Sequence, residues 1–294
     1  MRVTNTLIQR NATLTLQQNL QAVAKAQAQV STGQKYTSFA DDPQAQSSVM
    51  QTSSSLRALD QYKRNIDDAT SRANMEDSIL QQLGDSVTQA TQVAMQQGSA
   101  TSTAANRLAA KAQIDGLIDS VVSLGNTKYQ NTYLFGGNDV TDAPLSNAPP
   151  FYTGAAADTG SHTTEIASGQ IFKSNHNAKE VFLDTGTLQA LKDLSTALGN
   201  NDVTGINNAS GELTNAQQGI QALVGDLGAR ENQLENAGSN LDALKTNLTT
   251  FKSNLSEVDQ ESAITELVTR QTAYQSAMLA TSRVIGMTLT DYLK

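Results

Sequence analysis

The chain has 294 residues, of which 16% are charged, 4% are aromatic and none is Trp or Cys, and its formal net charge is -8. This acidic balance leaves no field of clustered Lys and Arg, so we expect neither a nucleic acid nor an anionic membrane as a partner. Without cysteine the chain has no disulfide framework and no thiolate for catalysis or metal binding.

The first predicted element is a helix near the N-terminus. Its apolar residues recur at helical spacing, Leu16, Leu20, Val23 and Val30 in one stripe and Leu7 and Leu14 on an adjacent face. The pattern breaks over residues 38–44, where Asp41 and Asp42 precede Pro43. These carboxylates could be read as an acid-base pair, but Asp before Pro is typical of a helix start, so we assign them to the turn.

Two further helices are predicted before residue 130. From 54 to 97 the apolar residues repeat every seven positions, Leu59, Ile66, Ala73, Leu80, Val87 and Ala94, with Tyr62, Ala69, Leu83 and Ala90 at the second seam position. This spacing predicts one long helix. After a polar break at 98–103, residues 104–129 keep helical spacing, so we expect a second helix that folds back on the first.

The centre of the chain loses the helical period at YLFGG, residues 133–137. Pro144, Pro149 and Pro150 follow closely, among many Gly, Asp and Thr residues. Residues 166–173 and 180–184 are short runs rich in Ile, Val and Phe, and we predict strands in both. We therefore expect a small β domain over 138–186, whose strand registers the sequence does not reveal.

Helical spacing returns in the C-terminal part of the chain. One helix is predicted over 188–198 and a long one over 207–257, with Leu234, Leu241, Leu248 and Leu255 at one heptad position and Ala237, Leu244, Phe251 and Val258 at the other. Each interior glycine of the long helix costs roughly 0.5 to 1 kcal/mol relative to alanine, so packing must hold it. The register breaks at 258–262, before a last helix.

These elements predict a mainly α protein with a small β insert, an α+β fold. A helix of about 50 residues is about 75 Å long, so we expect an elongated rod of long antiparallel helices whose N- and C-terminal segments pair as a coiled coil. Three domains are predicted: a terminal coiled-coil domain of 1–40 plus 259–294, a helical rod domain of 41–137 plus 187–258, and an outer β insert domain of 138–186.

The chain offers few groups for catalysis or metal binding. Its two histidines, His162 near Glu165 and His176 near Glu180, have only loose metal-ligand spacing, with no third ligand or general base. We interpret both as exposed loop residues. The paired glycines at 136 and 137, or 225 and 228, lack phosphate-loop spacing. We therefore expect no catalytic residue, no metal, no cofactor and no enzyme activity.

Several motifs resemble those of the flagellin superfamily. They are VSTGQK at 30–35, ADDP at 40–43, Asn65 with the helix around it, the stretch from Arg107 to Phe135 that leads into YLFGG, and residues 255–294. The resemblance covers roughly 1–137 and 205–294, whereas 138–186 shows none. Within the superfamily, MRVTN at 1–5, YQSAMLA at 274–280 and LTDYL at 289–293 are similar to subunits of the hook-filament junction.

The resemblance implies a structural adaptor that assembles with itself in a ring, stacks on the first hook-associated protein and offers flagellin a template. It also implies an extracellular position in the bacterial flagellum and export by the flagellar type III pathway, with a chaperone at the C-terminal helix. The start of the chain lacks the pattern of a cleaved signal peptide, which agrees with that route. The alternatives are a short flagellin, the filament subunit, and a type III secretion tip or translocator protein.

The apolar stripes receive two interpretations. Heptads usually pack within a chain, so the rod core is predicted to comprise Leu59, Ile66, Leu80, Leu83, Val87, Leu234, Leu241, Leu244, Leu248, Phe251 and Leu255. The terminal stripes resemble the superfamily's polymerising ends, so contacts between subunits are predicted for Leu7, Leu14, Leu16, Leu20, Val23, Val30, Leu267, Tyr274, Met278, Ile285, Leu289 and Leu293. Because a lone helix is marginal in water, we expect both termini to be largely disordered in the monomer and to fold on assembly. Tyr62, Lys63 and Glu76 are further candidates for rim contacts.

Overall fold

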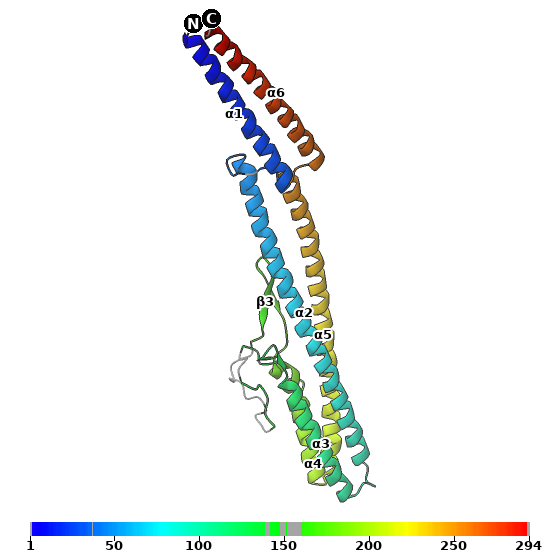
Figure 1. Ribbon diagram of the computed structural model, residues 1–294. Helices are drawn as coiled ribbons and strands as arrows, with labels where there is room; N and C mark the ends of the chain where they lie inside the picture. Colours follow the sequence, from blue (N-terminus) through cyan, green and yellow to red (C-terminus); the bar gives the residue numbers. More distant parts are fainter. Residues whose placement is uncertain (1, 37, 139–141, 148–150, 152–159, 293–294) are drawn as a thin grey trace. The chain divides into compact units, whose positions relative to one another are not determined.

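The computed structural model describes residues 2–36, 38–138, 142–147, 151 and 160–292 (Figure 1). The helices are α1 (Arg2–Thr32), α2 (Pro43–Gln97), α3 (Ala104–Gly125), α4 (Thr187–Gly199), α5 (Val203–Ser256) and α6 (Gln260–Tyr292), with a π-helical turn η1 (Lys179–Leu183). The strands are β1 (Lys128–Tyr129), β2 (Thr132–Tyr133), β3 (Thr163–Ala167) and β4 (Gln170–Lys173). β1 pairs with β2 and β3 with β4, both antiparallel. The predicted mainly helical fold with a small β part is confirmed.

The chain divides into two compact units, residues 1–58 with 243–294 and residues 59–242. Residues 43–58 of α2 and 243–256 of α5 belong to the first unit, and the remaining parts of both helices belong to the second. The three-domain division given above stays a prediction.

In the first unit the segment that follows α1 pairs with the end of α5. Gln34 and Glu257 form an antiparallel bridge, and Lys35 N donates to Ser256 O at 2.7 Å. Gly33, with φ of +69°, takes the left-handed conformation that ends α1. From this bridge α1 and α6 run side by side (Figure 1), as predicted for the terminal segments.

The turn before α2 uses the two aspartates as caps. Asp42 Oδ1 accepts a hydrogen bond from Ala45 N at 2.9 Å, which satisfies an N–H group of the first helical turn. Asp41 Oδ2 accepts from Ser38 N at 3.1 Å, and its Oδ1 pairs with Lys25 Nζ at 2.6 Å. The assignment of both carboxylates to the turn is confirmed, and α2 begins at Pro43 rather than at residue 54.

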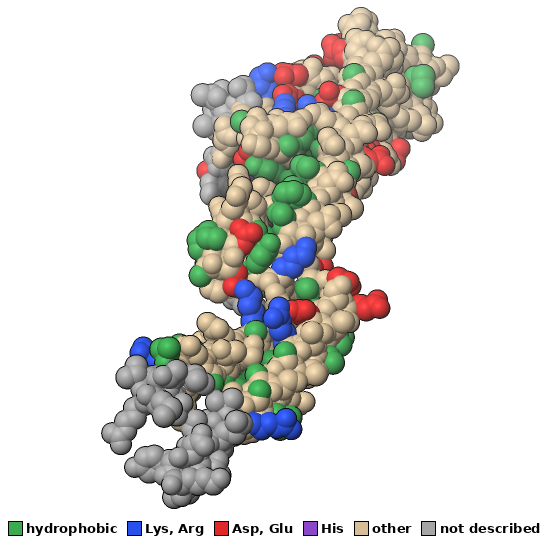
Figure 2. Space-filling model, turned by 90° about the horizontal axis from the view of Figure 1, so that it is seen from above, with side chains coloured by type: hydrophobic (Ala, Val, Ile, Leu, Met, Phe, Trp, Pro, Cys, Tyr) green, Lys and Arg blue, Asp and Glu red, His purple; other side chains and the backbone are tan. Residues whose placement is uncertain are grey.

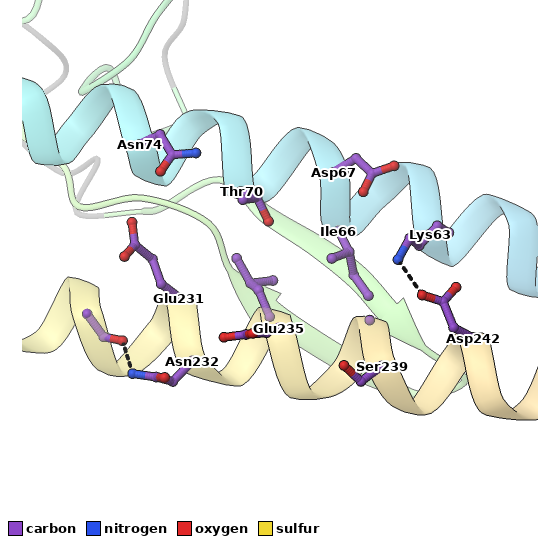
Figure 3. A pocket seen from close by; sticks show the side chains of 13 residues that line it. Lys63, Ile66, Asp67, Thr70, Asn74, Glu231, Asn232, Glu235, Ser239 and Asp242 are labelled. Carbon is purple, nitrogen blue, oxygen red and sulfur yellow. Dashed lines mark hydrogen bonds and ion pairs between the residues drawn. The ribbon is translucent and has the colours of Figure 1, made fainter.

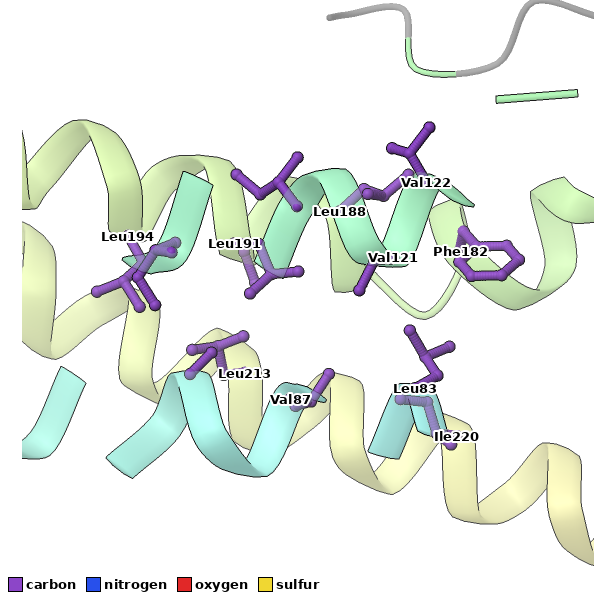
Figure 4. Close-up of a cluster of buried hydrophobic side chains, with 14 of the residues drawn as sticks. Leu83, Val87, Val121, Val122, Phe182, Leu188, Leu191, Leu194, Leu213 and Ile220 are labelled. Carbon is purple, nitrogen blue, oxygen red and sulfur yellow. The ribbon is translucent and has the colours of Figure 1, made fainter. Parts of the chain in front are cut away.

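In the second unit α2, α3, α4 and α5 pack around one apolar core (Figure 4). Leu83 and Val87 of α2 meet Val121 of α3, Leu191 of α4 and Leu213 of α5, and all five side chains are fully buried. Full burial of one such side chain contributes roughly 1.5 to 3 kcal/mol. This core explains how α5 tolerates its interior glycines.

Residues 166–173 form a hairpin rather than a single strand. β3 pairs with β4 across a turn at Gly169, whose φ is +73°, and the register shifts between Glu165 and Ala167. Asn65 Nδ2 of α2 donates to Glu165 O at 2.6 Å, so β3 is tied to the helix.

The strand predicted over 180–184 is wrong, because Lys179–Leu183 form the π-helical turn η1. Two reciprocal hydrogen bonds start this turn: Glu180 N donates to Asn177 Oδ1 at 2.9 Å, and Asn177 N donates to Glu180 Oε2 at 3.1 Å. Phe182 is buried edge-on against Phe135, with the ring centroids 5.4 Å apart. The apolar run is therefore buried by a helical turn instead of a sheet.

The predicted rod core is only partly buried. The structure buries Leu59, Ile66, Leu80, Leu83, Val87, Leu234 and Leu241, and leaves Leu248 and Leu255 half-buried. Leu244 is 46% exposed and Phe251 is 50% exposed, so their interpretation as core is wrong for the single chain. The physical reason is that the buried face of α5 ends at Leu241, although the heptad pattern of the sequence continues.

Candidate assembly surfaces

The inner face of the α1–α6 pair is built from small and medium apolar side chains. Ala26 and Ala263 are buried, at 4% and 7% exposure, which allows the two backbones to approach closely. Five residues predicted for contacts between subunits are half-buried in these helices: Leu16, Val23, Val30, Leu267 and Tyr274. In the single chain these positions therefore already have partial cover.

The outer face of the same pair carries large apolar side chains in water. Leu7, Leu14, Leu20 and Met278 are 57%, 48%, 51% and 48% exposed. Ile264, Val268 and Leu279 of α6 are also exposed, at 50%, 56% and 63%. Large apolar side chains that gather in water are suited to contacts with other proteins. The side chains of Ile285 and Leu289, and the whole of Leu293, lie outside the described residues.

A second apolar surface of the first unit lies on the end of α5. Leu244 and Phe251 stand seven residues apart and so share a helix face, with Leu248 half-buried between them. The stripe ends at the half-buried Leu255. Heptad residues without cover in their own chain are suited to a second helix.

The charged side chains do not form a continuous field on the face seen in Figure 2. Lys and Arg occur there in small groups, interspersed with Asp and Glu and with patches of apolar side chains. No described helix is long and apolar enough to cross a membrane.

A polar groove of about 550 Å³ runs between α2 and α5 in the second unit (Figure 3). Lys63 of α2 and Asp242 of α5 close it by an ion pair of 2.9 Å. Glu231 and Glu235 line it from α5, and Thr70 lines it from α2. Within the described ranges no group of three His, Cys, Asp or Glu side chains is placed to hold a metal ion.

The three candidates for rim contacts have different environments. Lys63 pairs with Asp242 across the groove and is 40% exposed. Tyr62 is half-buried, and its hydroxyl donates to Glu165 Oε1 of the β3–β4 hairpin at 3.5 Å. Glu76 is fully buried, so its interpretation as a rim contact is wrong.

The two histidines are held by hydrogen bonds of the fold. His162 Nδ1 lies 2.9 Å from Ser174 Oγ, and burial lowers the pKa of His162 below its ordinary value, with the nearby Arg72 charge acting in the same direction. His176 is only 4% exposed, so its interpretation as an exposed loop residue is wrong. Its ring contacts Glu76, 100 residues away along the chain, a contact that sequence spacing does not reveal.

Glu180 also serves the fold rather than a ligand. Its carboxylate accepts from Lys173 Nζ at 2.8 Å and from Asn177 N at 3.1 Å. Burial raises the pKa of Glu180, but these two partners outweigh burial and hold it below its ordinary value. Glu165, the other acidic neighbour of a histidine in sequence, accepts from Gly169 N at 2.8 Å in the hairpin turn.

Long paired helices with exposed apolar side chains are typical of proteins that pack with other chains. The model of the bacterial flagellin N-terminal helical region matches residues 3–139, and that of the flagellin C-terminal helical region matches residues 211–293. The chain therefore belongs to the flagellin superfamily, as its motifs suggested.

Among individual relatives, the chain is similar to flagellar hook-associated protein 3. The protein of that name from Escherichia coli (strain K12) is 24% identical over 303 residues, which cover 93% of this chain and 96% of the relative. The one from Salmonella typhimurium is 24% identical over 314 residues with the same coverage.

Solved structures share the fold. Bacillus cereus FlgL matches with a TM-score of 0.59 at 24% identity. The match covers 68% of this chain and 97% of the FlgL chain. The flagellar junction protein FlgL from Legionella pneumophila matches with a TM-score of 0.58 at 13% identity. The match covers 73% of this chain and 100% of that protein's chain.

Proposed function

We propose that the chain is a structural adaptor subunit of the bacterial flagellum at the junction between hook and filament. The observation that carries this proposal is the similarity to flagellar hook-associated protein 3 over nearly the whole length of both chains, 93% and 96%. The flagellin-type regions at both ends supply the surface that a filament of flagellin would continue.

In this role the subunit assembles with itself in a ring, stacks on the first hook-associated protein and receives flagellin on its other side. Leu7, Leu14 and Leu20 of α1 expose the apolar surface that such stacking buries. Ile264 and Leu279 of α6 are also exposed, and an export chaperone would cover this helix before assembly. Export through the flagellar type III pathway, without cleavage of a signal peptide, belongs to the same proposal.

The proposed role includes no catalysis and no cofactor. His162 and His176 engage Ser174 and Glu76, groups of their own fold, which agrees with a structural role. The three-domain organisation belongs to the proposal as well: a terminal domain that polymerises, a rod domain, and an outer insert at 138–186.

A short flagellin is the nearest alternative. It would share both terminal regions but would be present in many copies along each filament, whereas a junction subunit forms one short layer. Quantifying the chain against flagellin in sheared filaments separates the two. A type III secretion tip or translocator protein is disfavoured by the presence of both flagellin regions.

Deletion of the gene in its native host tests the proposal. We expect hooks without filaments by electron microscopy, together with flagellin shed into the medium, because flagellin would lack its template. Complementation with the intact gene should restore filaments. Normal filaments in the deletion strain would refute the junction role and leave a minor flagellin as the better reading.

A further inference from the structure

The part of α5 that belongs to the first unit has an uncovered apolar stripe with lysines along one edge. Leu244, Leu248 and Phe251 share a helix face, and the exposed fractions of Leu244 and Phe251 are 46% and 50%. Lys245 and Lys252 each follow a residue of the stripe and stand seven positions apart, so they lie along one side of it. We call these five residues the basic stripe.

The charges of the chain are divided unequally between its two units. Residues 43–58 and 243–256, the parts of α2 and α5 in the first unit, contain Arg57, Lys245 and Lys252 but no Asp or Glu. The first unit as a whole has ten Lys and Arg against seven Asp and Glu, whereas the second has ten against twenty-one. One chain therefore combines a basic unit with a strongly acidic one, and opposite charges favour contacts between unlike units of two copies.

The groove between α2 and α5 in the second unit carries unpaired negative charge (Figure 3). Five charged side chains line it, and two of them, Lys63 and Asp242, pair with each other at 2.9 Å. The other three are Asp67, Glu231 and Glu235, whose carboxylates form no hydrogen bond or ion pair with any residue that the structure describes. We call this groove the acidic groove.

The acidic groove also has an apolar lining and open space. Ile66 and Leu234 line it and are buried, at 4% and 1% exposure. Gly228 lines it as well, and a Cβ added there would meet nothing within 4 Å. A volume of about 550 Å³ admits apolar side chains, while the carboxylates suit the cationic heads of lysines beside them.

We propose that the basic stripe is a contact face for a second copy of this chain and that it packs against the acidic groove of that copy. The apolar side chains of the stripe cover the apolar lining of the groove, and Lys245 and Lys252 pair with its free carboxylates. Two different surfaces meet, so the contact repeats from copy to copy and can close into a ring. The inference deepens the proposed function, because it rests on assembly of the chain with itself.

Charge complementarity selects this occupant over a symmetric one. Two basic stripes placed face to face would bring Lys245 and Lys252 of one copy beside the same lysines of the other, which is unfavourable. The outer face of α1 is a poor match too, since residues 1–40 contain Arg2, Arg10, Lys25 and Lys35 and no Asp or Glu. The acidic groove offers both the apolar lining and the opposite charge.

Charge reversal on each surface tests the contact in the purified full chain. We expect the wild type to associate at low ionic strength, where charges act over a longer distance, and salt to weaken the association. K245E/K252E alone and E231K/E235K alone should each lower the association constant by about tenfold, because attractive pairs become repulsive. An equal mixture of the two variants should restore it, and so should one chain that carries all four substitutions.

A matched control separates this contact from a general effect of net charge. Asp85 and Glu212 are exposed in the second unit and do not line the acidic groove. D85K/E212K changes the net charge as E231K/E235K does, and it should associate like the wild type. Sedimentation equilibrium measures every association constant, and circular dichroism checks that each variant is folded.

Loss of association in both variants with rescue in the mixture supports the contact. A wild type that stays monomeric, a K245E/K252E variant that associates as the wild type does, or a mixture without rescue would overturn it. These results come from the purified chain, so they can fail while the deletion phenotype still supports the junction role, and the reverse.

If a variant does not fold, cross-linking of the wild type decides instead. A carbodiimide joins a lysine amine directly to a carboxylate, and a mixture of unlabelled and isotope-labelled chains distinguishes links between copies from links within one. We expect links between copies from Lys245 or Lys252 to Glu231 or Glu235. The absence of such links between copies would overturn the proposal.

Discussion

At the scale of single residues, Arg107 shows how one side chain can hold two turns of the fold together. The side chain is buried, and it donates to Gln97 O at 3.0 Å, to Ser99 O at 2.9 Å and to Asn201 Oδ1 at 2.6 Å. The planar guanidinium thus serves the turn between α2 and α3 and the turn between α4 and α5.

Replacing Arg107 tests this function. We expect R107A to lower the free energy of unfolding by about 2 to 3 kcal/mol, because it leaves the buried Gln97 O and the part-buried Ser99 O without this donor. The stability of R107K should fall between those of the wild type and R107A, since a lysine ammonium cannot donate in the planar, forked geometry of the guanidinium. The control R64A removes an exposed side chain and should change stability by less than about 0.5 kcal/mol. Urea unfolding followed by circular dichroism measures all three, and equal losses in R107A and R64A would contradict the expectation.

His162 predicts a loss of stability at acid pH. Burial and the Arg72 charge lower its pKa in the folded state, against a smaller opposing effect of Asp68. The unfolded chain then binds the proton more readily, so stability is lost as pH falls from the ordinary value of about 6.5 through the lowered value. We expect H162Q to flatten unfolding free energy against pH in this window. An unchanged acid slope in H162Q would show that other groups produce it.

At the scale of elements, α3 offers a matched pair of glycines. A Cβ at Gly125 would overlap Leu145 Cδ1 and lie 3.1 Å from Phe182 Cε2, whereas a Cβ at Gly116 meets nothing within 4 Å. We expect G125A to destabilise the second unit by about 1 to 3 kcal/mol through overpacking. G116A should stabilise it by roughly 0.5 to 1 kcal/mol through helix propensity. Thermal unfolding of both variants measures these changes in stability. A stabilising effect of G125A would mean that Leu145 and Phe182 can move aside at the end of α3 without cost.

The helices could be predicted from sequence because their heptads repeat over many turns, and each repeat adds to the same signal. The structure of the insert could not be predicted in this way. Residues 180–184 are too few for the spacing of apolar residues to distinguish a strand from a helical turn. The reciprocal Asn177–Glu180 caps decide it locally. Contacts between distant residues are also invisible to spacing, as the His176–Glu76 pair illustrates.

Solvent exposure limited the prediction of assembly residues in a different way. Spacing places Leu16 and Leu20 in one stripe, but Leu16 is half-buried whereas Leu20 is 51% exposed. The sequence therefore identifies an apolar stripe without dividing it between contacts within the chain and contacts to other subunits. On α5 it likewise did not reveal that Leu244 lacks cover.

The terminal helices predict a difference between monomer and assembly. Their pair buries chiefly alanines such as Ala26 and Ala263 and leaves larger apolar side chains exposed, so its stability in a single chain is marginal. We expect fast amide exchange over α1 and α6 in the monomer and slow exchange after assembly. The amides of α3 provide an internal control that should exchange slowly in both states. Slow exchange at both ends of the monomer would overturn the expected coupling of folding to assembly.

At the scale of the whole molecule, assembly and folding of the subunit can be separated by two neighbouring leucines of α1. Leu14 is 48% exposed, so L14E places a charge on a side chain that already lies largely in water and should weaken the α1–α6 pair little. Leu16 is half-buried in the same helix, so L16E should weaken the α1–α6 pair as well. The exposed Gln18 provides the control Q18E, which adds the same charge at a polar position.

In the deletion strain we expect L14E to be exported yet to leave hooks without filaments, because a carboxylate cannot be buried at an apolar subunit contact without a partner. Q18E should restore filaments. The purified L14E monomer should keep the circular dichroism and urea unfolding of the wild type, which distinguishes lost assembly from lost folding. Full filaments with L14E would place Leu14 outside the contacts between subunits and would direct attention to the exposed stripe of Leu244 and Phe251 on α5.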